Sequence, residues 1–324
     1  LVMNIAFRVD SSKKLGFGHI NRCKILARNL EKKNTSCIFI TQFKQTYEYF
    51  LSEGFIVFLI KKKNESEQIN QILKKENCLK LVIDSKRKSI KQLINNISKN
   101  IKIILIDNFL DSKTIDLTVI SSVKDPRKKY PKNCIVGKEY VLHGIENLPK
   151  NKIQKNKSIL ISMGGSDKYN ITKKIINSLL KKNINFEVNI VLGKLYDHEK
   201  QISKLINNKP YFHIVRNPAS LTSLMQKSTI GIITFGITVY ESAICRLPVF
   251  VISHSTENHE YSKLVEKYGW ISYIGKYNKI NYDLLTKNLL DLMNNKKELE
   301  KMKKNCSKID GLGPYRVSEY IKKL

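Results

Sequence analysis

Short apolar, β-branched runs alternate with longer amphipathic stretches along almost the whole chain. This alternation is typical of parallel strands connected by helices that cover the faces of a sheet. Before residue 148, strands are predicted at 3–9, 37–41, 55–60, 80–84, 101–106, 117–120 and 133–136, and helices at 19–32, 44–53, 66–76 and 88–98. The first half of the chain is therefore expected to form one doubly wound α/β domain.

The alternation stops at 147–157, a polar stretch that contains Pro149, and then starts again. The second set of strands is predicted at 158–162, 187–192, 211–215, 230–233, 248–252 and 271–274, and the helices at 170–182, 197–207, 219–227, 237–245, 258–268, 282–293 and 296–306. A last helix at 314–323 follows the helix-breaking run Gly311-Leu312-Gly313-Pro314.

The pattern predicts an α/β protein with two Rossmann-like, doubly wound parallel-sheet domains. We expect an N-terminal domain at 1–148, a C-terminal domain at 158–310, and a helix within 311–324 that packs back on the first domain. Because ligands of such sheets bind at the carboxyl ends of the strands, a cleft between the domains is the expected site.

The formal net charge of +30 raises the question of nucleic-acid binding. Eight of the 58 basic residues are Arg, and the Lys residues are spread over nearly every segment. Nucleic-acid modules instead cluster charge on one face and combine Arg with aromatic residues. We therefore expect no nucleic-acid partner. The diffuse positive field would favour an anionic nucleotide sugar and peripheral contact with an acidic membrane surface.

Cysteine spacing and hydropathy exclude further classes of protein. The six Cys residues show no metal-ligand or redox spacing, so we expect free thiols, no metal and no cofactor. No apolar run reaches the roughly 20 residues that span a bilayer, and the N-terminus lacks the pattern of a secretion signal. The expected location is the cytoplasm, and the default oligomeric state is a monomer.

The segment 8–23, Arg-Val-Asp-Ser-Ser-Lys-Lys-Leu-Gly-Phe-Gly-His-Ile-Asn-Arg-Cys, follows the first strand and runs into a helix. Its glycines allow close backbone approach to a ligand, and free amides at a helix start favour anions. His19 in the first helical turn can exchange a proton near neutral pH. The alternative interpretation is a tight strand-to-helix turn in which His19 is only a capping group.

Two more junctions have the composition of phosphate-binding turns. Residues 162–172 place Gly164 and Gly165 directly after a strand, with hydroxyl and amide side chains before the next helix. An ordinary loop in which Asn170 caps the helix is the alternative. Residues 234–241 can direct amides and hydroxyls at a diphosphate, and Glu241 can accept hydrogen bonds from a ribose. A glutamate in a first helical turn is also favoured by the helix dipole alone.

A fourth junction, residues 253–260, contains His254 and His259 together with two glutamates. The two imidazoles are five positions apart across a loop, which is poor spacing for a metal on one helix face. A polar loop that contacts substrate is the better interpretation. The stretch 107–111 after another strand can also reach the site, whereas His143, His198 and His213 are expected to be structural or exposed.

Together these motifs resemble the PseG/SpsG-like proteins, which are UDP-sugar hydrolases of pseudaminic acid biosynthesis and their relatives in surface and spore-coat polysaccharide synthesis. The resemblance runs from about residue 3 to 318. It rests on the ordered set Arg8-Val9-Asp10-Ser11, Gly16-Phe17-Gly18-His19, Met163-Gly164-Gly165-Ser166-Asp167, Thr234-Phe235-Gly236 and Leu247-Pro248. The turn at 234–238 and the loop at 256–259 are closer to the SpsG-like branch.

The resemblance implies a GT-B-like fold and release of UDP from a sugar like UDP-2,4-diacetamido-2,4,6-trideoxy-β-L-altropyranose. His19 would be the general base that activates water, and Asp10 would orient it or bind the sugar. The residues that would bind substrate or nucleotide are Arg8, Gly16, Gly18, Arg22, Gly164, Gly165, Ser166, Asp167, Asn170, Thr234, Phe235, Gly236, Thr238, Glu241, Asn258 and His259. A GT-B glycosyltransferase with a UDP-sugar donor and a non-enzymatic nucleotide-sugar-binding protein are the alternatives.

Overall fold

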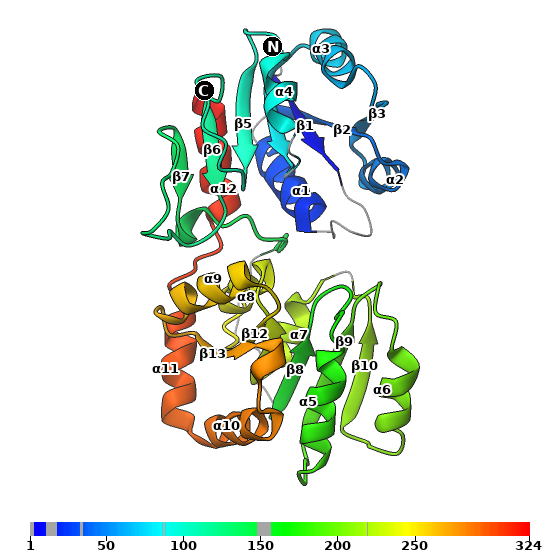
Figure 1. Cartoon of the computed structure of the whole chain (residues 1–324), viewed down its shortest axis with the longest axis vertical. Helices are drawn as coiled ribbons and strands as arrows, with labels where there is room; N and C mark the ends of the chain where they lie inside the picture. Colours follow the sequence, from blue (N-terminus) through cyan, green and yellow to red (C-terminus); the bar gives the residue numbers. More distant parts are fainter. Residues whose placement is uncertain are drawn as a thin grey trace. The chain divides into compact units, whose positions relative to one another are not determined.

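The computed structural model describes residues 3–10, 18–32, 35–85, 87, 89–147, 157–218 and 220–324. The chain divides into two compact units, 1–144 with 311–324, and 145–310. Each unit consists of one parallel sheet with helices on both faces (Figure 1). The predicted fold class, two doubly wound α/β domains, is therefore confirmed.

The first unit contains a seven-stranded sheet with the order β3-β2-β1-β4-β5-β6-β7. Its strands are β1 (Met3–Val9), β2 (Thr35–Thr41), β3 (Ile56–Leu59), β4 (Cys78–Asp84), β5 (Lys102–Ile106), β6 (Leu117–Ile120) and β7 (Cys134–Val136). Its helices are α1 (Gly18–Glu31), α2 (Lys44–Ser52), α3 (Glu65–Lys75), α4 (Ile90–Asn95), the 3₁₀ turn η1 (Lys138–Tyr140) and α12 (Gly313–Lys323). The strand order reverses at β1 and β4, which pair with each other.

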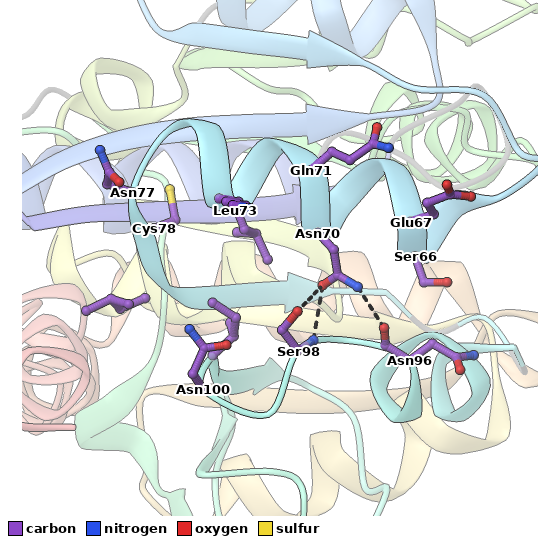
Figure 2. Close-up of a pocket in the computed structure, with 13 residues that line it drawn as sticks. Ser66, Glu67, Asn70, Gln71, Leu73, Asn77, Cys78, Asn96, Ser98 and Asn100 are labelled. Carbon is purple, nitrogen blue, oxygen red and sulfur yellow. Dashed lines mark hydrogen bonds between the residues drawn. The ribbon is translucent and has the colours of Figure 1, made fainter.

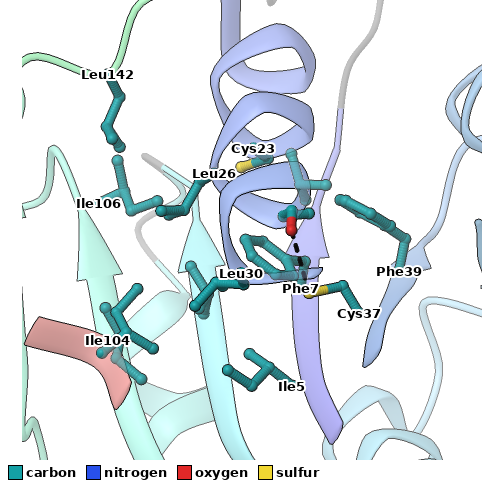
Figure 3. Packing of buried hydrophobic residues seen from close by; sticks show 14 of the residues in the cluster. Ile5, Phe7, Cys23, Leu26, Leu30, Cys37, Phe39, Ile104, Ile106 and Leu142 are labelled. Atoms are coloured by element: carbon teal, nitrogen blue, oxygen red, sulfur yellow. Dashed lines mark hydrogen bonds between the residues drawn. The ribbon is translucent and has the colours of Figure 1, made fainter. Parts of the chain in front are cut away.

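Alternate residues of the strands in the first unit face two separate apolar layers. On one face, Phe7 and Phe39 stack with ring centroids 5.1 Å apart, and Leu26 and Leu30 of α1 belong to the same buried cluster (Figure 3). On the other face, the buried residues of α3 and α4 cover the sheet. This packing fixes the first turn of α1 beside the carboxyl end of β4.

The C-terminal helix α12 is part of the first unit and packs on α1. The side chain of Lys80 is buried, and its Nζ donates hydrogen bonds to the carbonyl oxygens of Ile321 and Lys322 at 2.8 and 2.9 Å. A cation at the carboxyl end of a helix is favoured by the helix dipole. Lys80 therefore ties the end of α12 to β4.

The second unit contains a six-stranded parallel sheet with the order β10-β9-β8-β11-β12-β13. Its strands are β8 (Ser158–Ser162), β9 (Glu187–Leu192), β10 (Phe212–Arg216), β11 (Ile230–Thr234), β12 (Val249–Ser253) and β13 (Ile271–Lys276). Its helices are α5 (Ile171–Leu180), α6 (Glu199–Leu205), α7 (Thr222–Lys227), α8 (Ile237–Ile244), α9 (Thr256–Glu266), the 3₁₀ turn η2 (Tyr277–Lys279), α10 (Tyr282–Asn294) and α11 (Lys296–Cys306).

Several helices differ from the sequence prediction at their ends, and α4 and α9 are two of them. Helix α4 is shorter than the predicted 88–98, because the backbone N–H of Ser98 donates to Asn70 Oδ1 at 3.1 Å rather than continuing the helix. Helix α9 begins at Thr256 rather than 258, because the Ser255 hydroxyl caps it by accepting from the backbone N–H of Asn258 at 3.0 Å. Side-chain hydrogen bonds thus set both boundaries.

Candidate functional site

An imidazole and a carboxylate meet at the carboxyl edge of the first sheet. His19 lies in the first turn of α1, and Asp84 is the last residue of β4. Their Nδ1 and Oδ1 atoms are 2.6 Å apart. The Asp84 side chain is fully buried, whereas that of His19 retains 18% of its exposure. The imidazole therefore has one edge held inside the protein and remains partly accessible from outside.

Arg22, one helical turn after His19, joins this pair to a second carboxylate. Its Nε lies 2.5 Å from Asp84 Oδ2, and its Nη2 lies 2.6 Å from Asp84 Oδ1. Its Nη1 donates to Asp107 Oδ2, and Asp107 Oδ1 accepts from the backbone N–H of Ser121 at 2.7 Å. Asp107 follows β5 with a φ of 49°, a conformation that non-glycine residues rarely adopt. We call His19, Asp84, Arg22 and Asp107 the histidine cluster.

The charges of this cluster stabilise one another. Burial raises the pKa of Asp84, but the Arg22 charge and hydrogen bonds from His19 and Arg22 lower it by more, so the carboxyl stays ionised far below its usual range. Burial likewise lowers the pKa of Arg22, and the charges of Asp107 and Asp84 raise it by more. A permanently charged carboxylate therefore faces Nδ1 of His19.

A second group of charges lies at the same edge on the α3 face of the sheet. Arg8 is 1% exposed; its Nη1 is 2.6 Å from Asp10 Oδ1, and its Nε is 2.8 Å from Glu65 Oε1. Glu65 also pairs with Arg87 at 2.8 Å. Asp10 accepts further hydrogen bonds from the Thr41 hydroxyl at 3.0 Å and from a backbone amide at 2.9 Å. We call Arg8, Asp10, Glu65 and Arg87 the arginine cluster.

These contacts correct three sequence predictions. Asp10 does not orient His19, because its carboxylate is used by Arg8 and Thr41, and Asp84 holds the imidazole instead. Arg8 is not placed to bind substrate, because its guanidinium is buried between two carboxylates. Arg22 is 13% exposed and its donors go to two aspartates, so it supports the site instead of binding a ligand.

Gly18 and Gly16 are the remaining glycines that were predicted to bind substrate or nucleotide in this segment. Gly18 begins α1 and is exposed, and a Cβ added there would meet nothing within 4 Å. Gly16 lies outside the described residues.

In the second unit, the glycine loop after β8 lies beside the end of β11. A Cβ on Gly164, whose φ is +83°, would lie 3.4 Å from the Thr234 side chain. A Cβ on Gly193 would collide with the Gly165 carbonyl oxygen at 2.4 Å, so these two loops approach each other closely. Gly164, Gly165 and Ser166 are all exposed. The backbone of this loop is therefore accessible, and its role in binding a ligand stays a prediction.

Asp167 and Asn170 in the same loop have structural roles that the sequence did not predict. Asp167 is 5% exposed, and its carboxylate accepts from the backbone N–H groups of Ile171 and Thr172, both at 2.8 Å. It therefore caps α5 and is not available to bind a nucleotide. Asn170 precedes α5 without capping it, and its Oδ1 accepts from the Tyr196 hydroxyl at 2.6 Å.

The junction between β11 and α8 holds the predicted residues Thr234, Phe235, Gly236, Thr238 and Glu241. Thr234 is 9% exposed and ends β11, and the other four are half-buried. Gly236 immediately precedes α8 and has no side chain that could cap this helix. The backbone amides in the first turn of a helix favour an anion at this point.

The loop after β12 and the start of α9 form hydrogen bonds with this junction. His254 Nε2 lies 2.7 Å from the Thr234 hydroxyl, and Asn258 Nδ2 lies 3.4 Å from the Phe235 carbonyl oxygen. His259 Nδ1 lies 2.5 Å from the hydroxyl of Tyr273. Burial lowers the pKa of His254, which favours its neutral form. Asn258 and His259 are half-buried, and these contacts hold their side chains against the protein.

The sequence reasoning missed Asp84, Glu65, Arg87 and the contact of His254 with Thr234. The available signal for Asp84 was an acidic residue at the carboxyl end of an apolar strand, in the middle of the predicted sheet. Asp107 was noted only as part of a stretch after another strand. Glu65 and Arg87 carry no comparable signal, because Glu65 is 57 positions from its partner Arg8 and Arg87 is 22 positions from its partner Glu65.

A large groove in the first unit lies away from these groups. It has a volume of about 970 Å³ and runs between α3 and the segment that precedes β5 (Figure 2). Its side chains include Asn70, Gln71, Asn96 and Asn100, with Leu73 and Cys78 in the apolar part. No residue of the histidine cluster lines it, so its size alone does not identify it as a reaction site.

The described residues form neither a metal-binding group nor a membrane-spanning helix. Within them, no three His, Cys, Asp or Glu side chains are grouped to hold a metal ion. Among the same residues, no helix combines the length and hydropathy needed to cross a membrane.

The fold is that of the GT-B class, two Rossmann-like domains in one chain. MurG of Acinetobacter baumannii superposes with a TM-score of 0.70 at 12% identity, over 99% of this chain and 100% of that one. The glycosyltransferase of kitacinnamycin superposes with a TM-score of 0.74 at 10% identity, over 99% of this chain and 98% of that one. At this identity the likeness establishes the fold.

Three curated proteins are similar in sequence. Protein MJ1062 of Methanocaldococcus jannaschii is 29% identical over 82% of this chain. The match spans only 59% of the length of MJ1062. The spore coat polysaccharide biosynthesis protein SpsG of Bacillus subtilis is 22% identical, covering 78% of this chain and 77% of that one. The UDP-2,4-diacetamido-2,4,6-trideoxy-β-L-altropyranose hydrolase of Campylobacter jejuni is 23% identical, and the match covers 83% of this chain and 98% of the hydrolase. No family model matches the chain. The chain is thus a distant relative of PseG/SpsG-like proteins on a GT-B fold.

Proposed function

We propose that this protein is a nucleotide-sugar hydrolase that releases UDP from a UDP-linked amino or deoxy sugar. The observation that carries the proposal is the partly exposed His19 held through Nδ1 by a buried carboxylate at the carboxyl edge of a doubly wound sheet. The similarity to the Campylobacter jejuni hydrolase over 98% of that protein supports the reaction class. A sugar like that relative's substrate, used in nonulosonic acid or surface polysaccharide synthesis, is the first candidate.

In the proposed reaction, His19 is the general base. With Nδ1 engaged by Asp84, the lone pair that accepts a proton is on Nε2. As Nε2 takes the proton of a water molecule, the water oxygen forms a bond to the anomeric carbon. The bond between that carbon and the diphosphate oxygen breaks, and its electron pair leaves with UDP. The products are free sugar, UDP and the proton on His19, and such general-base catalysis contributes about 10²–10⁴-fold.

The diphosphate is proposed to bind in the second unit, at the start of α8. Gly236 and Thr238 would present backbone amides, which stabilise the negative charge on the leaving group. The exposed glycine loop at Gly164 and Gly165 lies beside Thr234 and would contribute further amides. Glu241, one turn into α8, would accept hydrogen bonds from the ribose.

A glycosyltransferase with a UDP-sugar donor is the second candidate. It is favoured by the GT-B fold itself, since the glycosyltransferase of kitacinnamycin superposes over 99% of this chain. In that reaction His19 would take the proton from an acceptor hydroxyl instead of water. The chemistry of the base is the same in both, so the acceptor decides between them.

Release of UDP from a panel of UDP-sugars, with and without candidate acceptors, tests the proposal. The hydrolase predicts rapid release without an acceptor, which falls by about 10²–10⁴-fold in His19→Gln while UDP binding is retained. Release that requires an added acceptor would favour the transferase. Tight UDP binding without turnover of any sugar would contradict both.

Gly236→Ala tests the proposed diphosphate site separately. Gly236 has an extended φ of 168°, and an added Cβ would meet nothing within 4 Å. The fold should therefore tolerate alanine, while the added methyl group should weaken UDP binding at the start of α8. Isothermal titration with UDP measures the affinity, and urea denaturation of the same variant checks that its fold is retained. Unchanged UDP affinity in Gly236→Ala would place the diphosphate elsewhere.

A further inference from the structure

Two groups compete for the same nitrogen of His19. Asp84 Oδ1 lies 2.6 Å from Nδ1 and can only accept a proton from it. Arg22 Nη2 lies 3.0 Å from Nδ1 and can only donate a proton to it. The two contacts require opposite tautomers of the neutral imidazole. With the proton on Nδ1 the free lone pair is on Nε2, and with the proton on Nε2 that atom cannot act as a base.

The geometry around Arg22 resolves the competition in favour of Asp84. Arg22 Nη2 lies closer to Asp84 Oδ1, at 2.6 Å, than to Nδ1 of His19, at 3.0 Å. A guanidinium hydrogen bond to a carboxylate is also stronger than one to a neutral ring nitrogen. Nη2 carries two hydrogens, so the decisive contact is the 2.6 Å approach of Nδ1 to Asp84 Oδ1, where two lone pairs without a hydrogen between them would repel each other. Nδ1 is therefore left to donate to the carboxylate.

We propose that Asp84 is the positioning residue that fixes His19 in the tautomer with its proton on Nδ1, and that Arg22 and Asp107 together hold Asp84 in place for this task. The proposal rests on the proposed function for the role of His19, and it adds residues that determine whether that base can work. Asp84 acts only through the imidazole, because its side chain is fully buried.

The anchor for Asp84 is built from four separate elements. His19 and Arg22 come from α1, Asp84 ends β4, Asp107 follows β5, and the backbone N–H of Ser121 after β6 holds Asp107 at 2.7 Å. Arg22 contacts both oxygens of Asp84, so the carboxylate cannot rotate without losing a hydrogen bond. Burial and the Arg22 charge together leave Asp84 ionised, which makes it a constant acceptor for Nδ1.

The arginine cluster supplies a matched control. Asp10 is also a buried carboxylate paired with a buried arginine at the same edge of the same sheet, at 2.6 Å. Its hydrogen bonds go to Arg8, Thr41 and a backbone amide. Asp10→Asn removes the same charge from the same unit without changing the acceptor at Nδ1. Any general effect of losing a buried carboxylate should therefore appear in both variants.

Nitrogen-15 NMR of the full chain, selectively labelled at histidine, measures the tautomer directly and needs no substrate. We expect wild-type His19 to carry its proton on Nδ1 when the ring is neutral. In Asp84→Asn the new amide can donate to Nδ1, so the population should shift toward the tautomer with the proton on Nε2. Asp10→Asn should retain the wild-type tautomer. The shift should accompany a fall in kcat of about 10²–10⁴-fold, with KM changed much less.

The outcomes separate this proposal from the proposed function. A proton on Nε2 in wild type, or an unchanged tautomer in Asp84→Asn, would overturn the positioning role whatever the reaction is. If His19→Gln keeps full turnover while the tautomer still follows Asp84, the proposed base is wrong and the positioning role stands. If Asp84→Asn fails to fold, the tautomer of wild-type His19 and the tautomer in Asp107→Asn test the positioning role instead. Asp107 is 21% exposed and contacts Arg22 rather than the imidazole, so this substitution disturbs the fold less.

Discussion

The histidine cluster and the arginine cluster lie at the carboxyl edge of the same sheet, and both join arginines to carboxylates. In the arginine cluster, Arg8 and Asp10 are 1% and 6% exposed. The histidine cluster has the same alternation of charge, but it ends in an imidazole that retains 18% of its exposure. Both networks reach the surface, the arginine cluster through Arg87, which is 29% exposed and stays charged, and the histidine cluster through an imidazole, which can accept a proton. The same type of ion-pair network thus supports a general base only where one member is a histidine.

The largest expected effect is on the stability of the arginine cluster. Arg8→Ala leaves the buried Asp10 without its nearest cation, with Arg87 3.9 Å away, and breaking such a buried pair typically costs about 3–5 kcal/mol. The free energy of unfolding from urea denaturation measures this loss, and the His19 tautomer should not change. A stable Arg8→Ala protein with an altered tautomer would show that the two clusters are not separate.

The next effect distinguishes the histidine cluster. Asp107→Asn removes the second carboxylate from Arg22, so Asp84 and His19 lose part of their anchor. Because small misplacements of a catalytic group can lower rates strongly, we expect kcat to fall by up to about 10²-fold with KM nearly constant. Steady-state kinetics on the best UDP-sugar measures both constants. A raised KM with unchanged kcat would instead make Asp107 a substrate ligand.

Acid should weaken both clusters in the same pH range. The net effect of nearby arginines is to lower the pKa of Asp84, Asp10 and Glu65 against the opposing effect of burial. Because these values are lower in the folded than in the unfolded chain, their stabilisation is complete above about pH 5 and is lost as the pH falls below about 4. Urea unfolding of wild type between pH 3 and 7 should show the loss, and Asp10→Asn should show less of it. Equal stability at pH 3 and 6 would contradict this view.

The smallest effect is expected at the rim of the arginine cluster. Arg87 pairs with Glu65 at 2.8 Å but is 29% exposed. Exposed ion pairs contribute about 0–1 kcal/mol, so Arg87→Ala should lower the free energy of unfolding by no more than that. A loss as large as that of Arg8→Ala would mean that Arg87, and not burial of Arg8, holds the cluster together.

Most of the fold could be predicted from sequence because burial determines it. Strands such as β4 and β8 are short β-branched runs, and their apolar side chains leave few alternatives to a buried parallel sheet. The misplaced ends of α4 and α9 depend on the side chains of Asn70 and Ser255. A periodic pattern does not show which single side chain will cap a helix.

The candidate site was less predictable because its contacts join distant segments. His19 was found from the turn that precedes it, but its partner Asp84 is 65 positions away and is adjacent only through the pairing of β1 with β4. The resemblance implied that Arg8 binds substrate and that Asp10 orients His19 or binds the sugar. Which polar groups at a strand end remain accessible depends on partners such as Glu65, which come from other elements.

Acceptor-free release of UDP by His19→Gln, compared with Asp10→Asn, tests the central claim most directly. Both variants are first matched for folding and for UDP affinity. The account predicts that His19→Gln loses about 10²–10⁴-fold in kcat while Asp10→Asn remains close to wild type. Equal activity of His19→Gln and wild type, or an equal loss in both variants, would contradict the assignment of the chemistry to the histidine cluster.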